Sequence, residues 1–278
     1  MSAAPGSSAR PFAGKVVVVT GSTRGIGRGT AVAFAELGAT VYVTGRTTTG
    51  ELSIHGAAAA VDAAGGHGIA VQVDHGDDAS IAALFQQVRE EQGKIHVLVN
   101  NVYKIPDPPA WGGGFWDHPI QVWDDQVGIG LRAHYVASWH AAPLMFEAGP
   151  GGLIANVSSP GGQSYHFSSS YGAGKAGLDR LSADMAFELR PQGIACCAIY
   201  PGSVATEFIQ EWSSKRGTDL SQSQTTLGVG RTIAALAQAP DLMERSGTIQ
   251  WCEDLSRAFD VRDENGNLLP EYGRRIRS

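Results

Sequence analysis

The chain has 278 residues, of which 43% are hydrophobic and 17% are charged, and its formal net charge is −6. This composition can bury a core, which excludes intrinsic disorder for most of the chain. The acidic balance argues against nucleic acid or an anionic membrane as the main partner, and no apolar run reaches the ~18 residues that a membrane span needs.

The cysteines and the N-terminus indicate the surroundings of the protein. Cys196, Cys197 and Cys252 have neither metal-ligand nor redox spacing, so we expect buried thiols, a reducing compartment and no metal. Residues 1–10 are rich in Ala, Ser, Gly and Pro and lack the hydrophobic stretch of a secretory signal. We therefore expect a flexible N-terminal tail at 1–10 on a cytoplasmic protein.

Short apolar runs alternate with longer helical patterns along the chain. The run of valines within 15–20 is typical of a strand buried on both faces. In chain order, strands are predicted at 15–20, 40–44, 69–73, 97–100, 153–157, 195–200 and 248–251, and helices at 26–37, 53–64, 77–92, 122–146 and 171–189. This alternation indicates an α/β fold. We expect a single-domain Rossmann fold, with a doubly wound parallel sheet of about seven strands and helices on both faces.

No change in composition divides the chain, so residues 11–278 are predicted to form one domain with a C-terminal extension at 253–278. Two segments, 102–119 and 201–226, exceed ordinary loop length and follow strands, where an open α/β sheet binds ligands. We expect them to be substrate loops; the alternative is that their aromatic side chains only fix the loops to the domain. The residues predicted to line a substrate pocket are Tyr103, Trp111, Phe115, Trp116, Phe208 and Trp212, together with Tyr165, His166 and Phe167.

A glycine-rich turn with the spacing G-x-x-x-G-x-G joins the first strand to the first helix. Glycines allow the backbone to turn tightly and to approach a pyrophosphate, which the positive N-terminus of the following helix stabilises. The alternative is a plain tight turn. We predict a dinucleotide-binding catalytic domain in which the turn contacts the cofactor through Gly21, Ser22, Thr23, Arg24, Gly25, Ile26 and Gly27.

The end of the second strand indicates which dinucleotide binds. NAD sites usually have a carboxylate here for the ribose 2′-hydroxyl. In this chain Arg46 ends the strand, and no carboxylate follows it before Glu51. Arg46 can bind a 2′-phosphate, and Arg24 can reach the same group, so we predict NADP(H). The alternative is two ordinary surface arginines. Asp74, which can accept a hydrogen bond from adenine or serve as a turn residue, is assigned with His75 to the cofactor site.

A second motif places Tyr171 and Lys175 four residues apart, on one face of a helix. A free tyrosine has a pKa of about 10, and a nearby ammonium lowers it, so that the phenol can exchange a proton with a ketone or alcohol oxygen. The preceding strand ends in Ser158 and Ser159, either of which can hydrogen-bond the same oxygen. A Tyr and a Lys four residues apart are common in proteins. The position of this pair after that strand is what favours a catalytic role.

Together these features resemble the short-chain dehydrogenase/reductase family over about residues 11–251. The resemblance implies that Tyr171 is the catalytic acid/base and that Lys175 lowers its pKa and binds the nicotinamide ribose. It implies that a strand-end serine, usually the second and here Ser159, orients the carbonyl, and that the backbone near Val204 and Thr206 holds the carboxamide. The remaining marks, assigned to the cofactor site except for Tyr200, are Asn100, Asn101, Tyr200, Pro201 and Gly202.

More closely, the chain resembles the dehydrogenase/reductase "member one" branch, which is linked to NADPH-dependent reduction of carbonyls, including steroids and other bulky ketones. The marks are at 115–117, 123–125, 130–135, 158–161 and 259–272. The chain departs from the wider family where Val102 and Tyr103 replace the usual Ala and Gly, and where Gly130 replaces an Asn of the proton relay. We expect Gly130 to leave space for water beside Lys175; the alternative is a mere loss of helix propensity.

The predicted function is NADP(H)-dependent hydride transfer between the nicotinamide and a carbonyl or secondary alcohol, with apolar or bulky ketones as substrates. Two alternatives stay open: a non-catalytic NADPH-binding sensor or scaffold, and a 3-oxoacyl-type reductase of carrier-bound groups, which the acidic net charge disfavours. The resemblance implies a homodimer or homotetramer formed through the two long helices that begin near Val122 and Tyr171.

Overall fold

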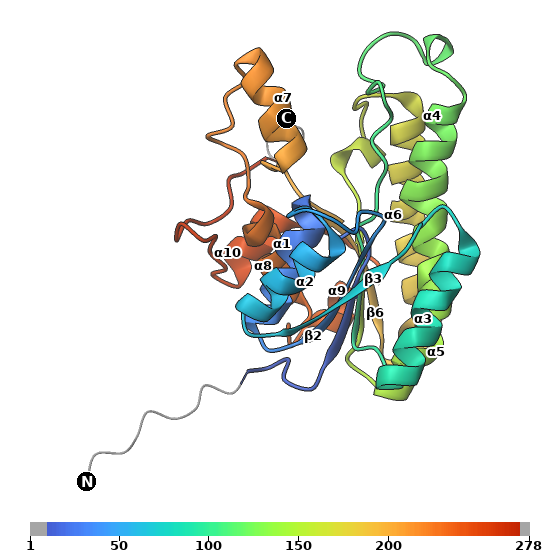
Figure 1. Cartoon of the computed structure of the whole chain (residues 1–278), viewed down its shortest axis with the longest axis vertical. Helices are drawn as coiled ribbons and strands as arrows, with labels where there is room; N and C mark the ends of the chain where they lie inside the picture. The colour runs from blue at the N-terminus through green and yellow to red at the C-terminus, as the bar shows by residue number, and fades with distance from the viewer. Residues whose placement is uncertain (1–9, 273–278) are drawn as a thin grey trace.

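The computed structural model describes residues 10–272 and contains one sheet of seven parallel strands in the order β3-β2-β1-β4-β5-β6-β7. This confirms the doubly wound α/β fold expected from the sequence (Figure 1). The predicted N-terminal tail, apart from Arg10, and residues 273–278 of the predicted extension lie outside the described residues. The strands are β1 (Val16–Val19), β2 (Thr40–Gly45), β3 (His67–Gln72), β4 (Val97–Asn100), β5 (Leu153–Val157), β6 (Ala195–Tyr200) and β7 (Ile249–Trp251).

Helices cover both faces of the sheet because successive strand residues point to opposite sides (Figure 1). Val17 and Val19 pack in a cluster with α1, α2, α8 and α10, whereas Val16 and Val18 pack in a second cluster with α3, α5 and α6. No helix within residues 10–272 is long and apolar enough to cross a membrane. The helices are α1 (Gly25–Glu36), α2 (Ile54–Ala63), α3 (Asp78–Gln92), α4 (Gln121–Trp123), α5 (Ala133–Ala148), α6 (Ser169–Leu189), α7 (Glu207–Arg216), α8 (Thr226–Leu236), α9 (Leu242–Arg245) and α10 (Cys252–Ala258).

The structure differs from the predicted elements at several places: helices α8, α9 and α10 were not predicted, and three further differences follow. The helix expected at 122–146 is α4, a π-helix over Asp124–Arg132 and α5 in succession. The expectation that 201–226 is irregular was wrong, because α7 lies within it: Thr206 caps the helix by accepting a hydrogen bond from the Ile209 amide, and Gly217 ends it at a φ of 68°. Edge strand β3 begins at His67, two residues earlier than expected, because it pairs with β2 from Thr40 onward.

Buried amides fix the centre of the sheet. Asn100 and Asn156 face each other across β4 and β5, and the Asn100 Nδ2 group donates to Asn156 Oδ1 at 2.8 Å and to Ser138 Oγ at 2.9 Å. Asn156 Nδ2 in turn donates to Ser182 Oγ at 2.9 Å. Because these polar atoms are buried and paired, they join the ends of β4 and β5 to α5 and α6 in one register.

Helices α1 and α8 cross in backbone contact through Gly29 and Gly230. A Cβ atom on Gly230 would lie 2.5 Å from the carbonyl oxygen of Gly29 and 2.6 Å from the Cα of Thr30, closer than real contacts allow. The absence of side chains at this crossing lets α8 pack directly on α1, the helix that follows the glycine-rich turn.

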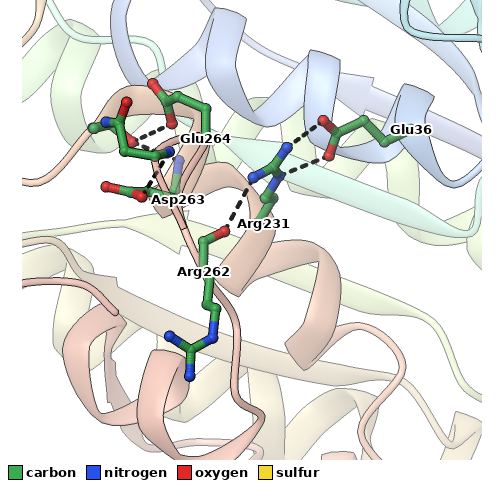
Figure 2. Close-up of polar contacts among 8 residues, drawn as sticks. Glu36, Arg231, Arg262, Asp263 and Glu264 are labelled. Carbon is green, nitrogen blue, oxygen red and sulfur yellow. Dashed lines mark hydrogen bonds and ion pairs between the residues drawn. The ribbon is translucent and has the colours of Figure 1, made fainter. Parts of the chain in front are cut away.

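The C-terminal segment is tied to the same pair of helices (Figure 2). The Arg231 guanidinium on α8 donates to both carboxylate oxygens of Glu36 on α1, at 2.6 and 2.8 Å, and to the carbonyl oxygen of Arg262 at 3.1 Å. Thr225 Oγ1 donates to the Glu264 carboxylate at 2.7 Å. These contacts hold the segment after α10 against the start of α8.

The C-terminal segment also supports the loop that follows β6. The Gln224 side chain accepts a hydrogen bond from the Gly202 amide at 3.0 Å and donates to the Pro270 carbonyl oxygen at 3.2 Å. Residues near 270 are therefore linked through one amide side chain to the loop at the carboxyl edge of the sheet.

Candidate functional site

A cleft of about 850 Å³ lies at the carboxyl ends of the strands, the edge where an open α/β sheet binds ligands. The glycine turn, the segments after β2 to β6, the start of α6 and the start of α7 form its walls. The structure brings together there most of the residues proposed from the sequence: Gly21, Thr23, Arg24, Gly25, Ile26, Arg46, Asp74, His75, Asn101, Tyr103, Trp111, Ser158, Ser159, Phe167, Tyr171, Lys175, Pro201, Gly202, Val204, Thr206 and Phe208.

The glycine turn is held against the end of β4. Gly21 has a φ of 64°, and a Cβ atom there would lie 2.8 Å from the Cα of Val102, so only glycine fits without strain. Asn101 Nδ2 donates to the carbonyl oxygens of Thr20 and Gly21 at 3.0 and 2.9 Å. Asn101, which we expected to contact the cofactor, thus also fixes the shape of the turn.

The N-terminus of α1 already holds an anionic group. The amide of Gly25 donates to Oε2 of Glu207, the first residue of α7, at 2.8 Å. The positive end of a helix favours negative charge at this position, and here a carboxylate oxygen occupies it. Sequence reasoning missed Glu207, since 182 residues separate it from Gly25.

Arg24 and Arg46 lie at the part of the cleft next to β2, and both are exposed. Within residues 10–272 neither guanidinium is paired with a carboxylate. Asp74 lines the same part, and its Oδ1 accepts from the Gly76 amide at 2.9 Å, so it does act as a turn residue. Buried His75 lies behind it with Nε2 2.9 Å from Thr44 Oγ1, and burial lowers the His75 pKa to about 4.

The two strand-end serines have different partners. Ser158 is buried, and its hydroxyl donates to Asp179 Oδ1 at 2.6 Å. The Ser159 hydroxyl accepts from the Gly161 amide at 3.1 Å and lies beside the Tyr171 side chain in the cleft lining. The geometry therefore favours Ser159 for contact with a substrate oxygen. Asp179 was missed, although it lies one helical turn beyond Lys175 and could have been found by its i+4 spacing.

Burial dominates the electrostatics of Tyr171 and Lys175. It raises the pKa of Tyr171 to about 12, and the neighbouring Ser159 hydroxyl opposes this rise. It lowers the pKa of Lys175 to about 8, against the opposing effect of Asp179. The expected lowering of the Tyr171 pKa by Lys175 was wrong for this structure. The Lys175 ammonium donates to the Val157 carbonyl oxygen at 2.9 Å and lies 5.9 Å from the Tyr171 ring centroid, so the loss of water outweighs its charge.

The space beside Gly130 is filled by a side chain. A Cβ atom on Gly130 would lie 3.1 Å from Cδ2 of Tyr103, and Lys175 Nζ lies 5.3 Å from the centroid of that ring. The expectation that Gly130 leaves room for water beside Lys175 was therefore wrong, because the phenol of Tyr103 occupies that room.

Aromatic rings form one wall of the cleft around Trp111. Its ring centroid lies 5.4 Å from that of Phe167 and 5.8 Å from that of Phe208. Trp212 packs on Trp111 at 5.1 Å from outside the cleft lining, and the Phe167 ring meets the Tyr171 ring edge to face at 5.2 Å. The wall thus extends from α7 to Tyr171.

Several proposed residues are not brought to the cleft. Phe115, Trp116 and Tyr165 instead lie at the surface, exposed to solvent by 69%, 75% and 72%. Inside the molecule, Ser22 and Asn100 are fully buried and bond the backbone and neighbouring side chains. The remaining residues outside the cleft lining are Gly27, His166 and Trp212.

Comparison with known proteins agrees with this geometry. A family model described as short chain dehydrogenase matches residues 15–217. The chain is 38% identical over 278 residues to dehydrogenase/reductase SDR family member 1 of Homo sapiens, which covers 95% of this chain and 88% of the human protein. It is 36% identical over 206 residues to L-rhamnose 1-dehydrogenase (NAD(P)(+)) of Azotobacter vinelandii, with coverages of 71% and 76%.

A solved structure shows the same likeness in three dimensions. A short chain dehydrogenase from Burkholderia cenocepacia in complex with NADP superposes with a TM-score of 0.74 at 27% identity, covering 87% of this chain and 97% of that one. Because the family model spans more than half of the chain and the human relative matches nearly all of it, the protein belongs to the short-chain dehydrogenase/reductase family.

Proposed function

We propose that the protein transfers a hydride between NADP(H) and a carbonyl or secondary alcohol, and that it works as a reductase of apolar or bulky ketones. The observation that carries this proposal is the meeting of Ser159, Tyr171 and Lys175 with the glycine turn in one cleft. The nicotinamide, when bound, supplies or accepts the hydride. The residues of this chain bind it, orient the substrate oxygen and move the proton.

The glycine turn fits a dinucleotide. The Gly25 amide donates to a carboxylate oxygen at 2.8 Å, and this contact with an anionic oxygen supports the binding of a pyrophosphate at the start of α1. Arg24 and Arg46, exposed and without carboxylate partners in the described part of the chain, are placed to bind a 2′-phosphate. The neighbour solved with NADP supports the same choice.

Tyr171 is suited to give a proton. With its pKa raised to about 12, its phenol is protonated at neutral pH, and a ketone oxygen that becomes an alkoxide takes that proton. The Ser159 hydroxyl, which lies beside Tyr171 in the cleft, holds the same oxygen in place. Alcohol oxidation, the same step in reverse, would need the phenolate to accept the proton of the alcohol.

The cleft supports an apolar substrate. Trp111, Phe167 and Phe208 line it next to Tyr171, and such walls bind apolar and aromatic groups. Lys104, the one further cation on the segment after β4, is paired with Asp125 at 2.8 Å and so does not favour an anionic substrate. We expect higher kcat/KM for aryl and cyclic ketones than for small 2-oxo acids.

Turnover of a ketone and alcohol panel with NADPH and NADH tests the proposal. Cofactor binding without any turnover would support the alternative of a non-catalytic sensor or scaffold. A marked preference for acyl groups on an acidic carrier would support the 3-oxoacyl reductase alternative. A preference for small 2-oxo acids over apolar ketones would contradict the proposed substrate class.

Replacing Arg46 by Ala tests the choice of cofactor. We expect kcat/KM with NADPH to fall by an amount equivalent to roughly 1.5 to 3 kcal/mol, the value of a hydrogen bond to a charged group, while kcat/KM with NADH stays the same. Arg180→Ala is a matched control, since Arg180 is exposed on α6 and pairs with Asp184. A wild-type preference for NADH would refute the assignment of NADP(H).

We also propose that the protein forms a homodimer or homotetramer through α5 and α6. Tyr135, Trp139 and Phe146 on α5 and Phe187 on α6 are 49%, 64%, 44% and 79% exposed, an amount of exposed aromatic surface that favours association. Sedimentation of the purified protein tests this, and a monomer at micromolar concentration would contradict it. The cytoplasmic location stays a prediction.

A further inference from the structure

Tyr103 and Gly130, two residues at which the chain departs from the usual pattern of the wider family, lie against each other. A Cβ atom on Gly130 would lie 3.1 Å from Cδ2 and 3.4 Å from Cε2 of Tyr103. The phenol ring therefore packs on the bare backbone of the π-helix, with little room for a larger residue. Gly128, on the same helix, has no atom within 4 Å of the corresponding position, so the need for glycine is specific to position 130.

The same ring contacts the two groups placed for proton transfer. Lys175 Nζ lies 5.3 Å from the Tyr103 ring centroid, within the range at which an aromatic face attracts a cation. Tyr103 and Tyr171 meet edge to face with ring centroids 5.8 Å apart. Within residues 10–272 the sole hydrogen-bond acceptor of the Lys175 ammonium is the Val157 carbonyl oxygen. The face of the Tyr103 ring thus adds a second attractive interaction to the buried Lys175 ammonium.

The hydroxyl of Tyr103 is also held in place, through a hydrogen bond from the Gln126 side chain. Gln126 Nε2 donates to it at 3.0 Å. Gln126 Oε1 accepts from the hydroxyls of Ser168, at 3.0 Å, and Ser170. Ser168 caps α6 by accepting from the Tyr171 amide at 3.3 Å. Gln126 therefore joins Tyr103 to the first turn of the helix that carries Tyr171 and Lys175.

We propose that Tyr103 is a positioning residue, which holds the Lys175 ammonium beside Tyr171 through the face of its ring, and that Gly130 is required because it gives this ring its place. The proposal rests on the proposed function in one respect only, namely that Tyr171 and Lys175 take part in the reaction. The contact between ring and ammonium can be tested without any substrate.

NMR of labelled lysine tests the contact directly. The chain has five lysines, at positions 15, 94, 104, 175 and 215, so protein made with lysine labelled at Cε gives few signals, and Lys175→Met identifies that of Lys175. Besides Tyr103, the titratable groups around the ammonium are Tyr171 and Asp179 on α6 and His134 on α5.

Replacement of Tyr103 by Leu or Phe separates the ring face from the hydroxyl. Tyr103→Leu keeps an apolar cover but removes the aromatic face that favours the ammonium, so the Lys175 pKa should fall below its value of about 8, by about one unit. Tyr103→Phe keeps the face and should leave the pKa unchanged. A Lys175 pKa in folded Tyr103→Leu equal to that of the wild type would overturn the proposal.

The kinetics of glycine variants test whether the packing of the Tyr103 ring against Gly130 matters for the reaction. Gly130→Ala and Gly130→Asn push on the ring and should lower kcat, whereas Gly128→Ala, the matched control, should not. We expect kcat to fall about tenfold in Tyr103→Leu, as for a lost contact between a ring and a buried cation. In the Tyr103→Leu background, Gly130→Ala should have no further effect on kcat, because the two residues act through one contact.

The outcomes separate this proposal from the proposed function. If the wild type reduces no carbonyl but Tyr103→Leu still shifts the Lys175 titration, the proposed function fails and the positioning contact stands. Full kcat in correctly folded Gly130→Asn would overturn the role given to Gly130.

Discussion

Tyr171 and Lys175 illustrate how strongly burial controls single side chains in this cleft. Lys175 is buried and Tyr171 is partly buried, so the pKa of the phenol rises to about 12 and that of the ammonium falls to about 8. Each shift favours the neutral form of its group. At neutral pH the phenol therefore holds a proton that it can give, while the ammonium is charged only below a pH of about 8, with Asp179 as the carboxylate that supports its charge.

At this scale the first prediction concerns Tyr171. Tyr171→Phe should lower turnover by about two orders of magnitude or more, the range that general acid catalysis supplies, while NADPH still binds. The Phe ring keeps the edge-to-face packing with Phe167. Tyr165→Phe is the control, since Tyr165 is exposed and its hydroxyl donates to the Phe167 carbonyl oxygen at 3.2 Å. Near-normal turnover of Tyr171→Phe would refute the assigned acid.

Helix α7 connects the two ends of the cleft. Its first residue, Glu207, is bonded to the start of α1, and Phe208 in the next position faces Trp111. The helix thus contacts both the proposed cofactor turn and the proposed substrate wall. A pyrophosphate that binds at Gly25 must take over a place at which the Glu207 carboxylate now accepts a hydrogen bond.

Glu207→Gln tests this competition between side chain and cofactor. Removal of the negative charge should tighten NADPH binding by about two- to tenfold, the effect of one charge at a helix terminus. Glu211→Gln on the same helix is the matched control, because Glu211 is exposed and pairs with Lys215. Titration calorimetry gives both dissociation constants. Weaker binding in Glu207→Gln would show that the carboxylate instead holds α7 in a binding-competent position.

Two buried histidines make the stability of the whole molecule depend on pH. Burial lowers the pKa of His75 to about 4 and that of His134 to about 3. His134 is bonded through Nε2 to the Val102 carbonyl oxygen at 2.9 Å, and Lys175 adds to the lowering of its pKa. Both side chains are neutral in the folded protein over a pH range in which they are protonated in the unfolded chain.

The free energy of unfolding should therefore fall as the pH drops below about 6.5. In that range the unfolded chain binds more protons than the folded one, so each histidine contributes a slope of about 1.4 kcal/mol per pH unit until the pH nears its folded pKa. His134→Gln, whose amide can still donate to Val102, should reduce the slope measured by urea unfolding between pH 7 and pH 4.5. The exposed His55 gives the control His55→Gln. An unchanged slope in His134→Gln would contradict the assignment.

The parts that the sequence predicted well depend on neighbouring residues. The alternation of strands and helices, the glycine turn and the Tyr171–Lys175 face all follow from patterns within a few residues. The contacts between Gly25 and Glu207 and between Gly130 and Tyr103 join distant segments, and no local pattern marks them. Likewise, the sequence pattern did not indicate whether the Phe115 side chain faces the cleft or the solvent, and in the structure the ring is exposed to solvent. The π-helix has no compositional mark, because it changes the hydrogen bonding and not the residue types.

The packing of Trp111 against Trp212 gives the protein an optical signal of its own. Tryptophan emits light in the range where a reduced nicotinamide absorbs, so a cofactor bound in the cleft that Trp111 lines would take up its excitation energy and dim its emission. Trp212 lies on α7 and Trp111 on the segment after β4, so a movement of α7 away from the cleft would change the surroundings of both indoles. Arrival of the cofactor and movement of the helix could then be followed in unlabelled protein.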